Sequence, residues 1–168
     1  MRKIIRFVTF IPMIGMMCVI WGFSANTGDV SSEQSQGIVS RIIDCVEEIT
    51  GVTFSEEEEQ IWEERIHTPV RKLAHTTEYM IFALTVAFPL LQYLSSCKKI
   101  RRITFLFCIF YASLDEIHQR FVPERSGQFR DVVIDGIGIG IGIFIFSLTY
   151  RVISKHGKLD NRELSDIR

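Results

Sequence analysis

Four long apolar segments constrain the fold of this chain more strongly than any other feature of its sequence. Each segment approaches the ~20 residues that an α-helix needs to cross the hydrocarbon core of a bilayer. The apolar residues are bunched in these segments rather than repeated with the period of a soluble core, and the mean hydropathy is +0.20. The sequence therefore predicts an all-α membrane protein, one domain over residues 1–168, with about four transmembrane helices. Their expected bounds are 4–23, 73–94, 103–122 and 132–153.

The third segment carries charge where a spanning helix is normally apolar. The apolar run 103–112 covers only about half of a bilayer, so a spanning helix has to continue through Asp115, Glu116 and Gln119. Polar groups at membrane depth are costly and normally face protein, water or substrate. We therefore expect this stretch to carry function. A re-entrant third segment is the alternative to a complete span.

In the fourth segment, glycine alternates with isoleucine over residues 136–142, as it would in a strand. A lone strand in lipid would leave its backbone groups unpaired, so a helix is the better prediction. On that helix Gly138 and Gly142 share a stripe with Asp131 and Asp135. Gly136 and Gly140 form a second pair at the same spacing. Small residues at this spacing allow a neighbouring helix to approach closely.

Basic residues in the short flanks of the apolar segments predict the orientation. They place both termini, the loop between the second and third segments and the polar tail 154–168 in the cytoplasm, and the acidic loop 24–72 outside. Arg125 and Arg130 lie in an outer loop against this bias, so we expect them to have local anionic partners. The basic residues that set the orientation are Arg2, Lys3, Arg6, Lys98, Lys99, Arg101, Arg102, Arg151, Lys155, Lys158 and Arg162.

The first apolar segment has a second interpretation. Basic residues precede it and small residues follow it, so residues 1–25 could be a cleaved signal peptide. The apolar run is longer than a typical signal core, which favours an uncleaved membrane anchor.

The outer loop 24–72 has helical order of its own. An amphipathic helix lying on the outer surface of the membrane is expected where Ile38, Ile42, Cys45, Val46 and Ile49 recur at helical spacing.

Two further helix-start signals lie in the same loop. Ser55 and Glu58 have the spacing of a capping box and predict the start of a second short helix. Thr68 and Pro69 then read as the N-cap and first residue of the second spanning helix.

Helical spacing brings polar side chains from three segments together. Lys72, His75 and Tyr79 share one face of the second segment, and Asp115 and Gln119 lie one turn apart on the third. Because successive spans alternate in direction, these groups all end at the outer leaflet, where we expect one polar pocket. Its candidate residues are Lys72, His75, Tyr79, Asp115, Glu116, Gln119, Arg125, Asp131 and Asp135.

These residues carry a family resemblance over about residues 23–150. The pattern is Lys72-x2-His75-x3-Tyr79, then Asp115-Glu116-Ile117-His118-Gln119-x-Phe121-Val122-Pro123-x-Arg125, then Asp131 and a Gly-rich segment. It resembles the VanZ-like membrane protein family, named for a teicoplanin-resistance protein. The chain departs from the family pattern at Glu124, where Gly is usual, and at Asp135, where Asn is commoner.

The resemblance implies a multi-pass protein of a Gram-positive cell envelope. Some members are associated with low-level resistance to glycopeptide antibiotics, especially lipid-tailed ones. Lowered susceptibility to teicoplanin-type glycopeptides is therefore one expectation for this chain.

One hypothesis for the pocket is a membrane-embedded hydrolase or transferase acting on a lipid-linked substrate. His75, Asp115 and Glu116 are the catalytic candidates, while Lys72 and Arg125 would hold a phosphate. A divalent cation could bind to the carboxylates of Asp115, Glu116 and Asp131, with Asp135 or His75.

Two other hypotheses need no catalysis. The protein could bind a membrane lipid, a cell-wall lipid intermediate or the acyl tail of a lipoglycopeptide, with the remaining candidates, Tyr79, Gln119, Asp131 and Asp135, among the binding residues. Alternatively, Arg125 and Arg130 pair with Asp131, Glu124 or Asp115, and the cluster only locks three helices together.

Other functions have little support in the sequence. The net charge of −1 and the position of the basic residues in membrane flanks argue against nucleic-acid binding. Four cysteines with no CxxC spacing argue against a disulfide framework or a thiolate metal site. They are Cys18, Cys45, Cys97 and Cys108.

Overall fold

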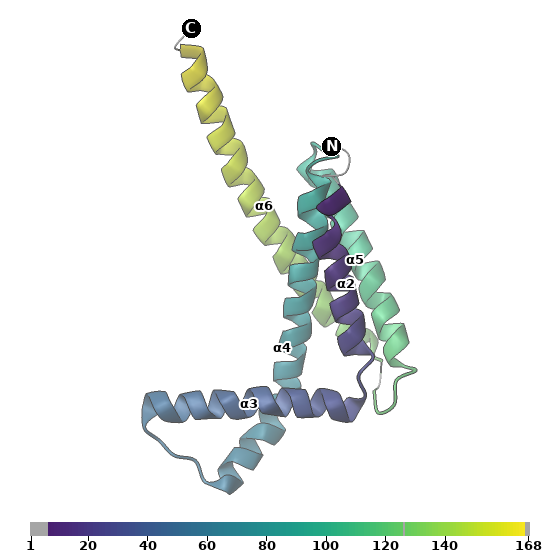
Figure 1. Ribbon diagram of the computed structural model, residues 1–168, viewed down its shortest axis with the longest axis vertical. Helices are drawn as coiled ribbons and strands as arrows, with labels where there is room; N and C mark the ends of the chain where they lie inside the picture. The colour runs from purple at the N-terminus through teal and green to yellow at the C-terminus, as the bar shows by residue number, and fades with distance from the viewer. Residues whose placement is uncertain (1–6, 126, 167–168) are drawn as a thin grey trace.

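The computed structural model describes the backbone of residues 7–125 and 127–166, and side chains as far as residue 154. The described part of the chain folds into helices without a strand, as the sequence predicts (Figure 1). The helices are α2 (Ile11–Ser24), α3 (Gly28–Thr50), α4 (Glu56–Leu90), α5 (Cys97–Gln119) and α6 (Phe129–Asp166). The first three residues of the span expected at 4–23 lie outside the described residues.

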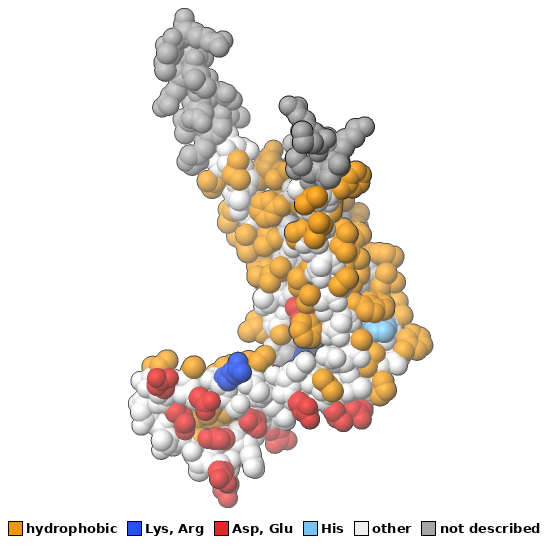
Figure 2. All heavy atoms as spheres, viewed as in Figure 1, with side chains coloured by type: hydrophobic (Ala, Val, Ile, Leu, Met, Phe, Trp, Pro, Cys, Tyr) orange, Lys and Arg blue, Asp and Glu red, His pale blue; other side chains and the backbone are white. Residues whose placement is uncertain are grey.

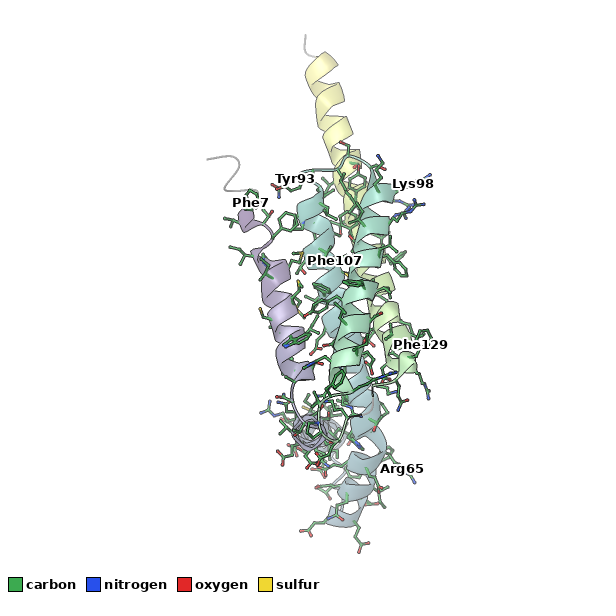
Figure 3. All side chains as sticks on the ribbon, turned by 90° about the vertical axis from the view of Figure 1, so that its right-hand side faces the viewer. Phe7, Arg65, Tyr93, Lys98, Phe107 and Phe129 are labelled. Atoms are coloured by element: carbon green, nitrogen blue, oxygen red, sulfur yellow. The ribbon has the colours of Figure 1, made fainter. Side chains whose placement is uncertain are left out.

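Four of these helices form an upright bundle, and α3 lies across one end of it. Figure 3 shows α2, α4, α5 and α6 running side by side with α3 seen end-on. The chain turns by 106° between α2 and α3. The amphipathic helix expected in the outer loop is therefore present, nearly perpendicular to the bundle.

The most extensive helix contact joins α4 to α6, and two glycines allow their backbones to approach closely. A Cβ added at Gly138 would lie 2.9 Å from the carbonyl carbon of Thr76, and one at Gly142 would lie 3.3 Å from that of Met80. Both are backbone atoms of α4, so no side chain fits between the helices here. By contrast, a Cβ at Gly140 would meet nothing within 4 Å. The close contact thus uses one of the two glycine pairs that the sequence offers.

Large aromatic side chains fill the centre of the bundle. Phe82 of α4 packs against Tyr111 and Phe107 of α5, with ring centroids 5.2 Å and 6.0 Å apart. The Tyr111 hydroxyl donates a hydrogen bond to the carbonyl oxygen of Met17 at 2.7 Å, which ties α5 to α2.

The outside of the bundle is apolar (Figure 2). On α5, Leu106 and Phe110 are each 60% exposed, and Phe144 on α6 is 63% exposed. Of the described helices, the Phe129–Ser154 part of α6 is long and apolar enough by itself to cross a membrane, and α2 and α3 together pass the same test as a bent pair. The expected count of four spans is not established by this test and stays a prediction.

Several helix boundaries differ from the prediction, most of all the start of α4 and the end of α6. α4 continues through Pro69, so the expected helix start at Thr68 was wrong. Proline removes only one backbone donor, and the His67 ring lies within 3.2 Å of the carbonyl oxygens of Glu63 and Glu64 one turn earlier. The helix therefore begins at the capping box instead, where Ser55 and Glu58 bond reciprocally as predicted. α6 also runs past residue 153, to Asp166.

The α4–α6 contact yields a first prediction. Gly138→Ala places a Cβ against the backbone of Thr76, and it should lower the free energy of unfolding by about 1–3 kcal/mol. Gly140→Ala is the matched control, because its Cβ meets open space and alanine favours a helix. Thermal unfolding of the purified protein in detergent measures both. Equal loss of stability in the two variants would contradict the assigned contact.

Candidate functional site

A polar cavity of about 230 Å³ lies where α4, α5, α6 and the loop between α5 and α6 meet. Most of the residues predicted for a pocket line it, and both charge signs are represented. The lining residues are Thr68, Arg71, Lys72, His75, Glu116, Gln119, Glu124, Arg125, Gln128, Asp131, Ile134 and Asp135.

Two predicted residues lie beneath the cavity rather than in its wall. Tyr79 is fully buried and packs edge-on against Phe82, while Asp115 is 2% exposed. The sequence analysis missed Arg71, although it lies one turn before His75 on the same helix and this spacing could have revealed it.

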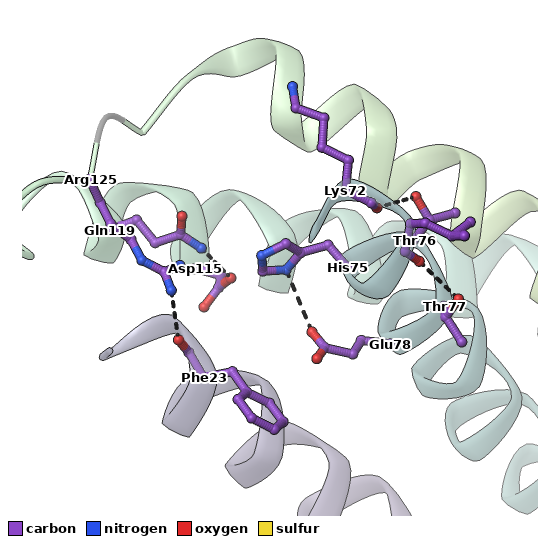
Figure 4. Close-up of polar contacts among 10 residues, drawn as sticks. Phe23, Lys72, His75, Thr76, Thr77, Glu78, Asp115, Gln119 and Arg125 are labelled. Carbon is purple, nitrogen blue, oxygen red and sulfur yellow. Dashed lines mark hydrogen bonds and ion pairs between the residues drawn. The ribbon is translucent and has the colours of Figure 1, made fainter. Parts of the chain in front are cut away.

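His75 extends from α4 towards Asp115 and Gln119 of α5 (Figure 4). Its Nδ1 atom lies 3.5 Å from Oε2 of Glu78 on the next turn of α4. Glu78, which is not among the candidate residues predicted from the sequence, is therefore the ionic partner of the histidine. The imidazole lies at the edge of the cavity with one nitrogen facing this carboxylate.

Asp115 lies among hydroxyl groups from two other helices. Gln119 donates a hydrogen bond to its Oδ2 atom at 3.2 Å, and the hydroxyls of Ser24 and Tyr79 lie beside it. Both hydroxyls and the Oδ1 atom of Asp115 are buried without hydrogen-bond geometry among the described residues. Buried polar atoms without a partner are rare in proteins and call for a specific explanation, so this cluster has unused hydrogen-bonding capacity next to the cavity.

Other candidate residues form contacts that join helices and loops of the site. Lys72 pairs with Asp131 at 3.0 Å, which joins α4 to α6. Glu116 accepts a hydrogen bond from the backbone N–H of Gln128 at 2.6 Å, which fastens the α5–α6 loop to α5. Asp135 is 4% exposed in the wall between these contacts.

Arg125 does not have the partner that was expected. Its Nη2 atom donates to the carbonyl oxygen of Phe23 at 3.0 Å, and its Nε atom is buried without a hydrogen bond. No carboxylate of the described residues forms an ion pair with it, and Asp131 pairs with Lys72 instead. Burial, followed by the positive charge of Arg71, lowers the pKa of Arg125.

Arg130 and His118 both lie outside the cavity lining. Arg130 is exposed and likewise forms no ion pair with a described residue. His118 stacks on Trp21 with ring centroids 4.2 Å apart and does not line the cavity.

The α5–α6 loop caps the first turn of α3. The carbonyl oxygen of Pro123 accepts from the backbone N–H of Gly28 at 3.2 Å, and the Glu124 carboxylate accepts from that of Asp29 at 3.3 Å. These bonds satisfy donors that a helix start leaves free. Glu124 achieves this with φ +60°, in the left-handed region.

The described residues bring no three His, Cys, Asp or Glu side chains close enough to share a metal ion. Glu116 is engaged by a backbone donor and Asp131 by Lys72, so the carboxylates proposed as a cation site point to different partners. This geometry gives the cation hypothesis no support.

Comparison with known proteins gives one match. The family model described as VanZ/LLP1 matches residues 9–150. No curated protein and no solved structure matches the chain.

The strained backbone at Glu124 yields a second prediction. Glu124→Ala keeps the left-handed strain and loses the bond to Asp29, so it should lower the thermal midpoint. Glu124→Gly loses the same bond but adopts a positive φ freely, so it should be more stable than the alanine variant by about 1 kcal/mol. Thermal unfolding of both variants measures the difference, and an alanine variant as stable as the glycine variant would refute this interpretation of the loop.

Proposed function

Because the chain belongs to the VanZ/LLP1 family, we propose that it is a multi-pass membrane protein that binds a lipid headgroup or a lipid-linked cell-wall intermediate. The polar cavity at the outer leaflet is the proposed site. In this proposal α2, α4, α5 and α6 span the membrane, and both termini are cytoplasmic. A ligand bound in this cavity changes the lipid or cell-wall intermediate that a teicoplanin-type glycopeptide encounters. The susceptibility of the cell to the antibiotic is thereby lowered.

The observation that carries this proposal is the inverted distribution of polar and apolar side chains. Asp115, Glu116 and Asp135 are each at most 5% exposed, whereas large apolar side chains cover the outside of the same helices. In water such an apolar surface would be a liability. In a bilayer the apolar side chains face lipid, and the charged groups gather in the protein interior where function needs them.

The orientation of α3 supports an interfacial depth for the cavity. An exposed apolar stripe with Ile38, Ile42, Val46 and Ile49 runs along this helix, and Figure 2 shows hydrophobic side chains along its upper edge, on the side of the bundle, with acidic residues below. A helix with this pattern lies in the plane of a membrane surface. The loop that lines the cavity bonds to the first turn of α3, which in this proposal puts the cavity at the depth of lipid headgroups.

A second candidate function is hydrolysis or group transfer on a lipid-linked substrate. The pairing of His75 with Glu78 favours it, because a carboxylate that orients an imidazole is a recurrent arrangement for general-base catalysis. The two functions differ in turnover: an enzyme changes its lipid, whereas a binding protein leaves it intact.

Two native cysteines on different sides of the proposed membrane allow a test of topology. Cys45 is exposed on α3, and Cys97 lies partly exposed at the start of α5. In variants that retain one of them as the single cysteine, a membrane-impermeant maleimide should label Cys45 in intact cells. Cys97 should be labelled only after permeabilisation. The reverse pattern, or labelling of both in intact cells, would contradict the proposed orientation.

A susceptibility assay tests the site itself. A teicoplanin-sensitive Gram-positive host expressing the wild type should become less susceptible, and His75→Ala or Asp115→Asn should abolish the gain because both groups belong to the polar cluster. His67→Ala and Asp44→Asn are matched controls of the same chemistry outside the cavity lining.

Blotting should confirm equal membrane levels of all variants. Retained protection in well-expressed site variants would assign the cluster a structural role. No protection by the wild type would refute the antibiotic part of the proposal.

A further inference from the structure

A second cavity, of about 500 Å³, opens beside the polar one (here called the α3 groove). Apolar groups of α2, α3 and α4 form part of its wall, namely Phe23, Gly37, Ile38, Val70 and Ala74. Figure 2 shows the concave corner between the bundle and α3 in which it lies. The two cavities share three residues, Arg71, His75 and Arg125.

The wall that the two cavities share carries two arginines that form no ion pair, although carboxylates also line both cavities, among them Asp135 in the polar cavity and Glu78 in the α3 groove. Arg71 and Arg125 come from different segments, yet they lie close enough for the charge of Arg71 to act on Arg125. Neither forms an ion pair with a described carboxylate, since the ion pairs at the cavity join Lys72 to Asp131 and His75 to Glu78.

Two of the nearby acids accept hydrogen bonds from backbone groups. The carboxylate of Glu116 accepts from the backbone of Gln128, and that of Glu124 accepts from the backbone of Asp29. Two guanidinium groups held together repel each other unless an anion lies between them. The buried Nε atom of Arg125, which has no hydrogen-bond partner among the described residues, is a donor available to such an anion.

We propose that the ligand is a long-chain phosphate ester, with its phosphate held by Arg71 and Arg125 and its alkyl chain in the α3 groove. This inference rests on the proposed function and names the chemical class of its ligand. Phosphate fits because its several oxygens can accept from two guanidinium forks at once, and arginine binds such groups bidentately. An alkyl chain fits because Phe23, Ile38, Val70 and Ala74 line the same groove as the two arginines.

The probe for this inference is hexadecyl phosphate, added to the full chain in neutral detergent. A ligand that binds the folded state raises the thermal midpoint, so a saturable rise should give its affinity. Hexadecanol tests the chain without the charge, and inorganic phosphate tests the charge without the chain. Hexadecyl phosphate should stabilise the protein more than either.

Variants separate the two halves of the site. Arg71→Gln and Arg125→Gln should each weaken binding of hexadecyl phosphate about tenfold or more, because each removes charge-assisted hydrogen bonds. Arg102→Gln, which lies exposed near the start of α5 and lines neither cavity, should bind as the wild type does. Arg71→Gln keeps the test decisive if Arg125→Gln fails to fold after losing its bond to Phe23.

Gly37→Leu tests the groove, because an added Cβ there meets nothing within 4 Å and the longer side chain enters the groove. This substitution should weaken the binding of hexadecyl phosphate and leave the effect of inorganic phosphate on the thermal midpoint unchanged. Gly15→Leu on α2, also in open space, is the matched control.

Three outcomes would overturn the inference. Equal stabilisation by hexadecanol would exclude recognition of the phosphate, and equal stabilisation by inorganic phosphate with an inert Gly37→Leu would exclude the groove. No stabilisation by hexadecyl phosphate would refute the ligand class. The proposed function would survive that last result if the cysteine labelling and the His75 and Asp115 variants behave as expected.

Discussion

The close approach of α6 to α4 is the contact on which the polar site depends. Gly138 meets the backbone of α4 at Thr76, and Asp135 and Asp131 lie one and two turns earlier on the same face of α6. Their positions are therefore fixed opposite the turn of α4 that carries Lys72 and His75. A larger residue at Gly138 would separate the helices just where the Lys72–Asp131 pair and the cavity need them together.

The charged groups of the cluster fall into two sets, one with partners inside the protein and one with polar atoms that lack a partner. Lys72, Asp131 and Glu116 have partners that hold helices and a loop in place. Asp115 and Arg125 each retain a buried polar atom without a hydrogen-bond partner among the described residues. A purely structural cluster would be expected to satisfy its buried groups, since an unsatisfied one costs about 1–3 kcal/mol. The division therefore favours a site that completes its hydrogen bonds with a ligand.

Features that depend on helical periodicity could be predicted from the sequence. The all-α fold, the amphipathic α3, the capping box at Ser55 and the shared face of Lys72 and His75 depend on spacing within one helix. Helical spacing also predicts that glycines of α6 allow a close helix contact. It does not distinguish the Gly138/Gly142 pair, which contacts α4, from the Gly136/Gly140 pair.

The errors concern features decided by tertiary contacts. Pro69 reads as a helix start, yet α4 passes through it and packs on α3 and α6. The partner of Arg125 could not be deduced, because it is the carbonyl oxygen of Phe23, 102 residues away. The left-handed Glu124 is likewise explained only by its bond to the first turn of α3, a contact between distant segments.

Geometry also bears on whether binding or catalysis is the better supported function. The 3.5 Å between His75 and Glu78 is long for a hydrogen bond, so the imidazole is not yet held as tightly as a working general base requires. Catalytic contacts often tighten only once substrate is bound. The two arginines, by contrast, line the same two cavities from different segments, and neither forms an ion pair with a described carboxylate. Ligand binding is thus consistent with the observed arrangement as it stands, whereas catalysis requires the His75–Glu78 pair to close further when the ligand arrives.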